Sequence, residues 1–204
     1  MRKFKFFTSF DKEEKWLGEM AKQGYKFTKK SFWYEFEPAT TTDTTIKMDY
    51  RTFKKQEDFE DYCALFEDSG WEHITGTKRS GYQYFKKTIE KGNEDIFSDT
   101  VSKAGRYKRL SDMWMSLVSL LTPIFIVLVF TNSIDGEALL NPKLLYYTPG
   151  LWEKTGAEFW KAFLFETPFA FFRGFSWVLI LMMIFLYLIF SIKANVQYQK
   201  TQRD

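Results

Sequence analysis

The uncharged stretch from Gly174 to Ile192 constrains this chain more than any other part of its sequence. A helix that crosses a bilayer core of about 30 Å needs about 20 apolar residues, each rising about 1.5 Å. A helix on the surface of a soluble domain keeps a polar face, and this stretch has none. A second apolar stretch, from Met113 to Thr131, lies upstream. We therefore expect a membrane protein with a transmembrane hairpin of two helices.

Length and composition limit the classes of protein that remain. The residues before Met113 are enough for one soluble domain of ordinary size. The formal net charge of +3 is too small to indicate a nucleic-acid-binding protein. The single cysteine, Cys63, excludes a disulfide within the chain, and the single histidine, His73, excludes a metal site with several histidine ligands. We expect no cofactor, no metal and no nucleic-acid partner.

The part before the spans repeats one pattern at an offset of 46 residues. Helical spacing of apolar residues predicts one helix that ends at Gly24 and a second, over residues 54–69, that ends at Gly70. Strands are predicted before each helix, over residues 4–10 and 46–53, and alternating aromatic residues predict a hairpin after each glycine. The corresponding residues are Trp16 and Tyr62, Leu17 and Cys63, Met20 and Phe66, Gly24 and Gly70, and Tyr25 and Trp71.

These elements predict an α+β fold, a ferredoxin-like split β-α-β domain made of a duplicated βαββ unit and followed by the transmembrane hairpin. Ser98 or Asp99 can cap a linker helix that runs into the first span. The predicted segments are a cytoplasmic ferredoxin-like domain (1–91), a juxtamembrane linker helix (92–112), transmembrane helix 1 (113–131), an extracytoplasmic connection with an interfacial helix (132–173), transmembrane helix 2 (174–192) and a cytoplasmic tail (193–204).

Charged residues beside the spans predict the orientation of the chain. The linker before the first span and the tail after the second are basic, whereas the connection has more acidic than basic residues. Because Lys and Arg are enriched in the cytoplasmic flanks of membrane helices, we expect both termini in the cytoplasm and a multi-pass membrane protein. In the connection, aromatic and charged residues are interleaved between Trp152 and Phe163, which is typical of a helix lying in the outer interface.

Several aromatic and glycine pairs fall in an order that resembles a known family. The chain is similar over roughly residues 1–110 to the bacterial domain-of-unknown-function 2812 family, whose members are often encoded beside PadR-type transcriptional regulators. The resemblance implies a protein of the cell membrane of Gram-positive bacteria and implies no catalytic residues. The residues that carry it are Trp16-Leu17, Gly24-Tyr25, Tyr34-Glu35-Phe36, Asp49-Tyr50-Arg51, Gly70-Trp71-Glu72, Tyr84-Phe85, Ser98-Asp99, Ser102-Lys103 and Arg106-Tyr107-Lys108.

Two groups of residues are candidate contacts for a partner or for lipid. Aromatic residues on the strands face both sides of the sheet, so some should pack on a partner or on the linker helix; stacking on RNA bases is the alternative. Basic residues before the first span favour contact with anionic lipid, and a specific docking patch is the alternative. Arg173, at the outer edge of the second span, is expected to reach lipid phosphate or to pair with Glu166; a functional charge within the membrane is the alternative. The candidates are Trp33, Tyr34, Tyr50, Tyr82, Tyr84, Lys103, Arg106, Lys108, Arg109 and Arg173.

The sequence predicts no catalytic residues. Cys63 lies on the apolar face of its predicted helix, as expected of a small buried side chain rather than of a nucleophile. We therefore expect a non-catalytic, membrane-anchored binding or sensory module that regulates a protein partner, with a link to a PadR-type regulator implied by the resemblance. An accessory subunit of a transporter or export complex is the alternative, and a membrane-bound enzyme is the third. Ser116, Ser119 and Thr122 form a stripe of small residues that suits packing against a partner's spans or a homo-oligomer.

Labelling of single cysteines tests the predicted topology. In intact cells and a Cys63-free background, a membrane-impermeant thiol reagent should reach Asn141→Cys but not Lys200→Cys. The reason is that the connection is expected outside and the tail inside. The opposite labelling pattern would place the N-terminal domain outside and overturn the functional expectation.

Overall fold

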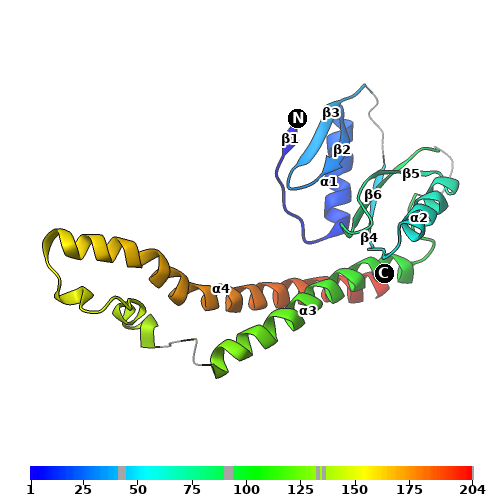
Figure 1. The fold of residues 1–204 in the computed structure, drawn as a ribbon. Helices are drawn as coiled ribbons and strands as arrows, with labels where there is room; N and C mark the ends of the chain where they lie inside the picture. Colours follow the sequence, from blue (N-terminus) through cyan, green and yellow to red (C-terminus); the bar gives the residue numbers. More distant parts are fainter. Residues whose placement is uncertain (41–44, 90–93, 132–133, 135–136, 204) are drawn as a thin grey trace. The chain divides into compact units, whose positions relative to one another are not determined.

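Two βαββ units form the N-terminal part of the structure, a computed structural model that describes residues 1–40, 45–89, 94–131, 134 and 137–203 (Figure 1). The first unit consists of β1 (Arg2–Lys3), α1 (Phe10–Lys22), β2 (Tyr25–Lys30) and β3 (Tyr34–Pro38). The second consists of β4 (Ile46–Tyr50), α2 (Gln56–Asp68), β5 (Trp71–Thr75) and β6 (Tyr82–Lys87). Each unit has one three-stranded antiparallel sheet, in the orders β1-β3-β2 and β4-β6-β5.

The internal repeat is confirmed by the backbone. Helices α1 and α2 begin and end 46 positions apart, at residues 10 and 56 and at residues 22 and 68. The strand register also shifts at equivalent places, between Phe27 and Lys29 in the first sheet and between His73 and Thr75 in the second. A shared irregularity of register is hard to explain by the general frequency of helix–glycine–strand corners. The two units are therefore copies of one supersecondary structure.

The fold class is α+β with two small antiparallel sheets, whereas the sequence predicts a ferredoxin-like domain. Strands β2 and β5, which are equivalent edge strands, lie beside each other. The predicted strand over residues 4–10 is wrong, because only Arg2 and Lys3 pair in β1 and helix α1 already begins at Phe10. The predicted boundary between the domain and the linker helix, at residues 91 and 92, lies outside the described residues.

Aromatic and aliphatic side chains fill the core of the N-terminal part. In the first unit, Leu17 and Met20 of α1 are buried together with Phe27 and Phe36 of the strands. In the second, a cluster of Tyr62, Trp71 and Phe85 is completed by partly buried neighbours, namely Phe53, Phe59, Cys63, Phe66 and Ile96. Each helix thus covers its own sheet with the face that the sequence periodicity predicts.

Two long apolar helices follow, α3 (Thr100–Phe130) and α4 (Gly156–Arg203). Asp99 caps α3, since its carboxylate Oδ1 accepts the backbone N–H of Ser102 at 2.7 Å. By length and composition both helices could cross a membrane, and almost none of their most apolar stretches is buried. The described residues between them include three short 3-10 turns, η1 (Glu137–Leu139), η2 (Pro142–Leu145) and η3 (Leu151–Glu153).

The structure has one helix, α4, where the sequence predicts a separate interfacial helix and a second span. Helix α4 continues through Pro168, although proline removes a backbone donor and crowds the preceding turn, and through Gly174, a weak helix former. At about 1.5 Å per residue, its 48 residues extend about 72 Å, more than twice a bilayer core.

The chain divides into two compact units, Met1–Met113 with Phe190–Asp204, and Trp114–Ile189. In the first of these, Ser111 of α3 and Ser191 of α4 are joined by reciprocal hydrogen bonds. Each hydroxyl lies 3.0 to 3.1 Å from the other residue's carbonyl oxygen, and the two Oγ atoms are 3.0 Å apart. These small buried side chains let the two helices approach closely at this point.

Substitution of the two corner glycines tests the repeat. Gly24 and Gly70 both have φ of 83°, a left-handed conformation that a β-branched residue adopts only with strain. A Cβ would also lie 3.3 Å from the Ala39 carbonyl oxygen at Gly24 and 2.9 Å from Ile89 Cδ1 at Gly70. Gly24→Val and Gly70→Val should each lower the free energy of unfolding by more than about 1 kcal/mol, measured by thermal unfolding.

Gly18 provides the matched control for this experiment. It lies within α1 with ordinary helical geometry, and a Cβ there would meet nothing within 4 Å. Gly18→Ala should leave stability unchanged or raise it by about 0.5–1 kcal/mol. Unchanged melting temperatures for both valine variants would show that neither corner requires glycine, and would contradict an equivalent structural role for Gly24 and Gly70.

Candidate functional site

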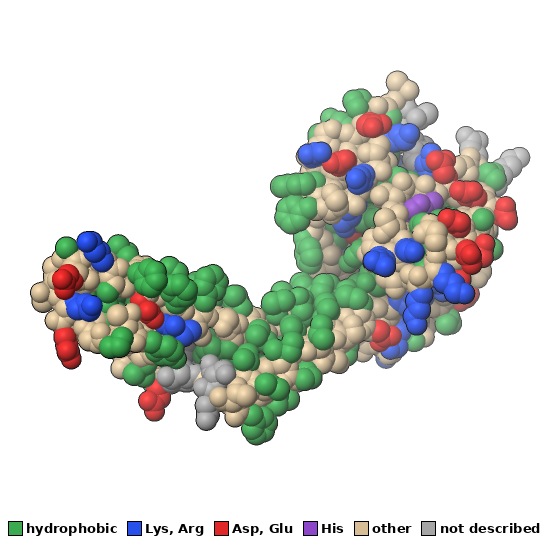
Figure 2. All heavy atoms as spheres, viewed as in Figure 1, with side chains coloured by type: hydrophobic (Ala, Val, Ile, Leu, Met, Phe, Trp, Pro, Cys, Tyr) green, Lys and Arg blue, Asp and Glu red, His purple; other side chains and the backbone are tan. Residues whose placement is uncertain are grey.

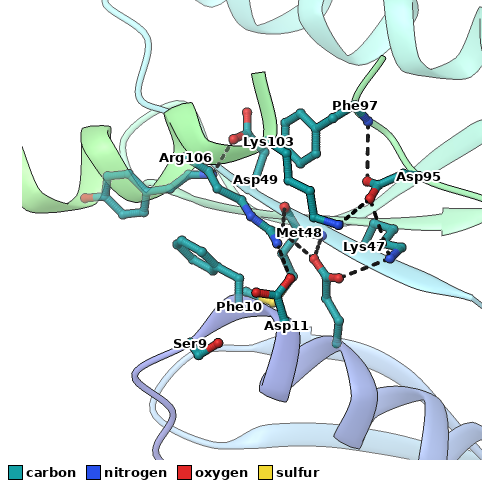
Figure 3. Close-up of polar contacts among 12 residues, drawn as sticks. Ser9, Phe10, Asp11, Lys47, Met48, Asp49, Asp95, Phe97, Lys103 and Arg106 are labelled. Carbon is teal, nitrogen blue, oxygen red and sulfur yellow. Dashed lines mark hydrogen bonds and ion pairs between the residues drawn. The ribbon is translucent and has the colours of Figure 1, made fainter. Parts of the chain in front are cut away.

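The first turns of α3 are buried in the N-terminal part rather than exposed beside it. Ala104, Tyr107 and Ser111 recur at helical spacing on one face, and Arg106 and Leu110 extend that face. The segment is thus amphipathic, and its buried face carries a charged residue. The candidate functional site is the polar network that these turns form with α1 and β4 (Figure 3).

Arg106 lies at the centre of this network and is fully buried. Its guanidinium donates to Glu14, to the carbonyl oxygen of Met48 at 2.8 Å and to Asp11 at 2.7 Å. Burial lowers the pKa of Arg106, but the charges of Glu14 and Asp11 outweigh it and raise the pKa above its usual value. Arg106 therefore stays charged, and the charge joins α3 to α1 and β4.

Tyr107 and Arg109 add contacts on either side of Arg106. The Tyr107 hydroxyl donates to Asp11 at 2.7 Å and accepts the backbone N–H of Phe10 at 3.1 Å, and burial raises its pKa to about 12. Arg109 donates to Asp49 and to the carbonyl oxygen of Tyr50, both at 2.5 Å. One turn of α3 therefore holds the start of α1 and the end of β4 together.

Asp49 also connects α3 with α2. Its second carboxylate oxygen accepts the hydroxyl of Tyr62 at 2.8 Å, while the first accepts the backbone N–H of Tyr50 at 2.7 Å. Burial, followed by the charge of Asp49, raises the pKa of Tyr62 well above its usual value. The carboxylate is thus fully used by an arginine, a tyrosine and a backbone donor.

A chain of ion pairs continues the network toward solvent. Lys47 lies 3.3 Å from Glu14 and 3.9 Å from Asp95, and Asp95 accepts from Lys103 at 2.7 Å. Burial would raise the pKa of Asp95, but the hydrogen bond from Lys103 and the charge of Lys47 outweigh it and lower the pKa. Lys103 is therefore held beside Asp95, with its ammonium group directed into the network (Figure 3).

A second buried carboxylate, Glu13, joins the two sheets. It accepts the hydroxyls of Tyr34 at 2.6 Å and Tyr84 at 2.7 Å and the ammonium of Lys30 at 2.8 Å. Burial is the largest cause of the raised pKa of both tyrosines, and Glu13 adds to it. Both hydroxyls therefore stay protonated and act as donors that tie β3 and β6 to α1.

The structure separates the residues that the sequence groups as candidate contacts. Tyr34, Tyr50 and Tyr84 are buried and Tyr82 is half-buried, so the strands present no open aromatic face among the described residues. Trp33, in contrast, is exposed. Arg106 and Arg109 point into the domain, so the predicted lipid contact does not describe them. The physical reason is that buried carboxylates of α1 and β4 offer these arginines closer counter-charges than lipid phosphate does.

The remaining basic candidates lie in two different settings. Lys108 is exposed and pairs with Asp112 one turn later. Arg173 belongs to the second compact unit, where it forms an ion pair with Glu166 and donates twice to the carbonyl oxygen of Leu145. Its guanidinium also lies 4.0 Å from the ring centroid of Tyr147. These contacts fasten the connection to α4.

The carboxylates of the network are not among the candidate contact residues that the sequence singles out. Acidic residues such as Asp11 and Glu13 are favourable in the first turn of any helix, so their place in the sequence does not show a tertiary role. One signal was available: inward-facing tyrosines on strands need hydrogen-bond acceptors when buried, and acidic residues on a covering helix can supply them.

The chemistry available to this arrangement is limited. The described residues contain no group of three or more His, Cys, Asp or Glu side chains that could hold a metal. Burial raises the pKa of the Cys63 thiol, and burial lowers the pKa of His73, whose Nε2 lies 3.0 Å from Gln83 Oε1.

An open groove of about 470 Å³ runs beside the network between α1 and β4, lined by Asp11, Glu14, Lys15, Gly18, Glu19, Lys22, Thr45, Ile46 and Lys47.

Fold and network together define an α+β domain whose buried polar network receives the start of a long apolar helix. The chain belongs to the family described as "Protein of unknown function (DUF2812)", which matches residues 9–119. The matched range begins one residue before α1 and ends within α3. It contains all the acidic and basic residues of the network described above. Comparison with curated proteins and with solved structures finds no match.

Replacement of Arg106 tests the network. Arg106→Met should lower the free energy of unfolding by about 3–5 kcal/mol, because buried Glu14 would lose its shortest ion pair and keep the longer one, 3.3 Å, to Lys47. Thermal unfolding of the full chain in detergent measures the loss. Lys108→Met is the matched control on the same helix, where an exposed pair contributes about 0–1 kcal/mol. Equal melting temperatures for the two variants would contradict a stabilising role of Arg106.

Proposed function

We propose that this protein is a non-catalytic, membrane-anchored module in which an N-terminal binding or sensory domain regulates a protein partner. One observation carries the proposal: Arg106 and Tyr107 are buried in the domain, half-buried Arg109 pairs with Asp49, and the helix that bears them continues to Phe130 through an apolar stretch. A flexible tether would need none of these contacts. A helix held in this way passes tilt or rotation between domain and membrane.

We also propose that the chain lies in a bacterial cell membrane with both termini in the cytoplasm. Two apolar helices of sufficient length support the membrane location. The exposed residues Lys108, Lys193 and Lys200 support the orientation, because they flank the spans without being used inside the domain. The internal pairing of Arg106 and Arg109 does not weaken this support. The enrichment of Lys and Arg on the cytoplasmic side of membrane helices concerns where these residues occur in the chain.

The duplicated units are, in this proposal, halves of a ferredoxin-like arrangement. Support comes from the βαββ order of each unit and from the position of β2 beside β5, which brings equivalent edges of the two sheets together. In this arrangement α1 and α2 cover one face of the sheets, and α3 contacts the domain where α1 and β4 meet.

The absence of catalysis is proposed from how the titratable groups are used. Glu13, Glu14 and Asp49 each accept several hydrogen bonds from tyrosine, lysine, arginine or backbone donors. A general base needs a lone pair that faces a substrate, and these carboxylates direct theirs to partners within the fold. Their arrangement suits mechanical connection better than proton transfer.

A second function, accessory subunit of a transporter or export complex, is favoured by the surfaces of the helices. Leu120, Val127, Leu179 and Phe185 are examples of large apolar side chains that stay exposed along α3 and α4. Such surfaces suit lipid or the spans of another chain, including a second copy of this one. In this case the hairpin, rather than the domain, would make the functional contact.

Purification of the full chain from native membranes tests the proposal. In mild detergent a stoichiometric partner chain should co-elute and be identified by mass spectrometry. A flexible Gly-Ser segment inserted after Asp112 should preserve membrane insertion and abolish regulation of that partner, because it uncouples the domain from the span. The same segment after Lys154, between η3 and α4, is the control and should change nothing.

The identity and behaviour of the partner separate the alternatives. A PadR-type regulator or another soluble partner would agree with the proposed function. A multi-span transport protein that binds the insertion variant normally would favour the accessory subunit. Normal regulation by the insertion variant would contradict coupling through α3 and reduce the hairpin to a passive anchor.

A further inference from the structure

Three aromatic side chains form an exposed cluster on the N-terminal part. Phe4 follows β1, and Phe32 and Trp33 form the turn between β2 and β3. The ring centroids lie 5.2 to 5.4 Å apart in all three pairs, yet the residues are 58%, 70% and 43% exposed. Figure 2 shows hydrophobic side chains standing out from this side of the N-terminal part. This is one contiguous apolar surface and not a scatter of single residues.

The charges around this cluster are mostly basic, and Glu35, an acidic neighbour on β3, forms an ion pair with Arg2 at 2.9 Å. Residues 1–7 and 25–33 contain lysines and an arginine and no acidic residue. Lys5 lies over the rings of Phe7 and Trp16, 5.1 and 5.0 Å from their centroids, and Lys29 is exposed at the end of β2. Aromatic side chains surrounded by basic ones are the composition of segments that enter the headgroup region of an anionic leaflet.

A contact within the same compact unit places this surface near the end of a span. The ring of Phe6, itself 66% exposed, lies 5.8 Å from the ring of Phe190 in α4. Phe190 is close to the end of the uncharged run, which stops at Ile192 before Lys193. Since two residues span at most about 7 Å, Phe4 lies within reach of the level at which α4 would leave the hydrocarbon core. The headgroup layer beyond that level is about 5–7 Å thick.

We infer that Phe4, Phe32 and Trp33 form a second membrane contact, which inserts into the headgroup region of the anionic leaflet on the side of the N-terminus. The inference rests on the membrane anchoring of the proposed function and adds a partner for the domain itself. Trp33 places its ring at the interface, as Trp does in membrane proteins, and Lys29 faces lipid phosphate. With α3 at one point and this surface at another, the domain has a fixed orientation on the bilayer.

Site-specific fluorescence on the full chain tests this contact. In a Cys63→Ser background, Phe32→Cys is labelled with an environment-sensitive dye and reconstituted in phosphatidylcholine vesicles with or without phosphatidylglycerol. Lipids that carry a quencher near the headgroup should quench the dye severalfold more at position 32 than at Leu65→Cys, an equally exposed site on α2. Phosphatidylglycerol should increase the quenching, and high salt should decrease it.

A third labelled position separates failure of this inference from failure of the anchoring. Val127→Cys lies in the apolar part of α3 and should be quenched by lipids that carry the quencher deep in the acyl chain. Quenching at 127 without quenching at 32 overturns the second contact and leaves the anchoring intact. No quenching at 127 overturns the anchoring and the contact together.

Two further arms identify what covers the surface. Phe4→Ser with Trp33→Ser should strongly reduce quenching at position 32 while quenching at 127 is retained. A dye at 32 that is shielded but unquenched by lipid, and that becomes exposed when the protein is diluted with empty vesicles, would identify a second copy of the chain as the occupant and overturn the inference.

Discussion

The buried charge of Arg106 is the constraint on which the N-terminal part depends. Removing an ion of this size from water costs on the order of 20 kcal/mol in an idealised apolar medium, so the guanidinium must find counter-charges inside the fold. Glu14 and Asp11 supply them from α1, and the Met48 carbonyl oxygen supplies a further acceptor from β4. The start of α1, the middle of β4 and the first turns of α3 must therefore lie where these groups meet. A well-packed apolar substitute for the whole network could be equally stable, and what the charges add is one specific way of assembling three elements.

The duplication explains why only one side of the domain receives α3. Positions 13 and 14 of α1 correspond to Phe59 and Glu60 of α2. Phe59 packs on Phe53 and His73, and Glu60 is exposed and accepts a hydrogen bond from Gln56. The second unit therefore closes its core with an aromatic ring at the position where the first buries a carboxylate. The two units share a backbone, with corner glycines and register shifts at equivalent places, but differ in the side chains that bind a third element. That asymmetry turns a symmetric scaffold into one with a single docking position for a helix.

Much of the backbone could be predicted from the sequence, because local patterns determine it. The spacing of Leu17, Met20 and Gly24 marks a helix and its end wherever the helix packs, and the Asp99 cap depends only on residues three positions away. The polar network could not be predicted in the same way, since Arg106 and Glu14 are 92 positions apart. A basic residue before a membrane span has the same appearance in sequence whether it faces lipid or a buried carboxylate. The same holds for Glu13, which has the properties of an ordinary residue in the first turn of a helix until Tyr34 and Tyr84 are seen to converge on it.

The arginines beside both apolar stretches follow one rule: each is neutralised within the chain. Before the first stretch, Arg106 and Arg109 pair with carboxylates of the domain. Before the second, Arg173 pairs with Glu166 and donates to the Leu145 carbonyl oxygen. If the uncharged run from Gly174 occupies the hydrocarbon core, the first third of α4 lies outside it, and the Arg173 pair sits at the boundary where an unpaired charge would be most costly. The lysines, in contrast, stay exposed at residues 108, 193 and 200. Arginine, with its planar set of donors, holds elements together here, and Lys103 does so through Asp95, whereas the lysines nearer the apolar stretches stay exposed. A count of positive residues beside an apolar stretch therefore does not separate the structural ones, Arg106 and Arg109, from the exposed Lys108.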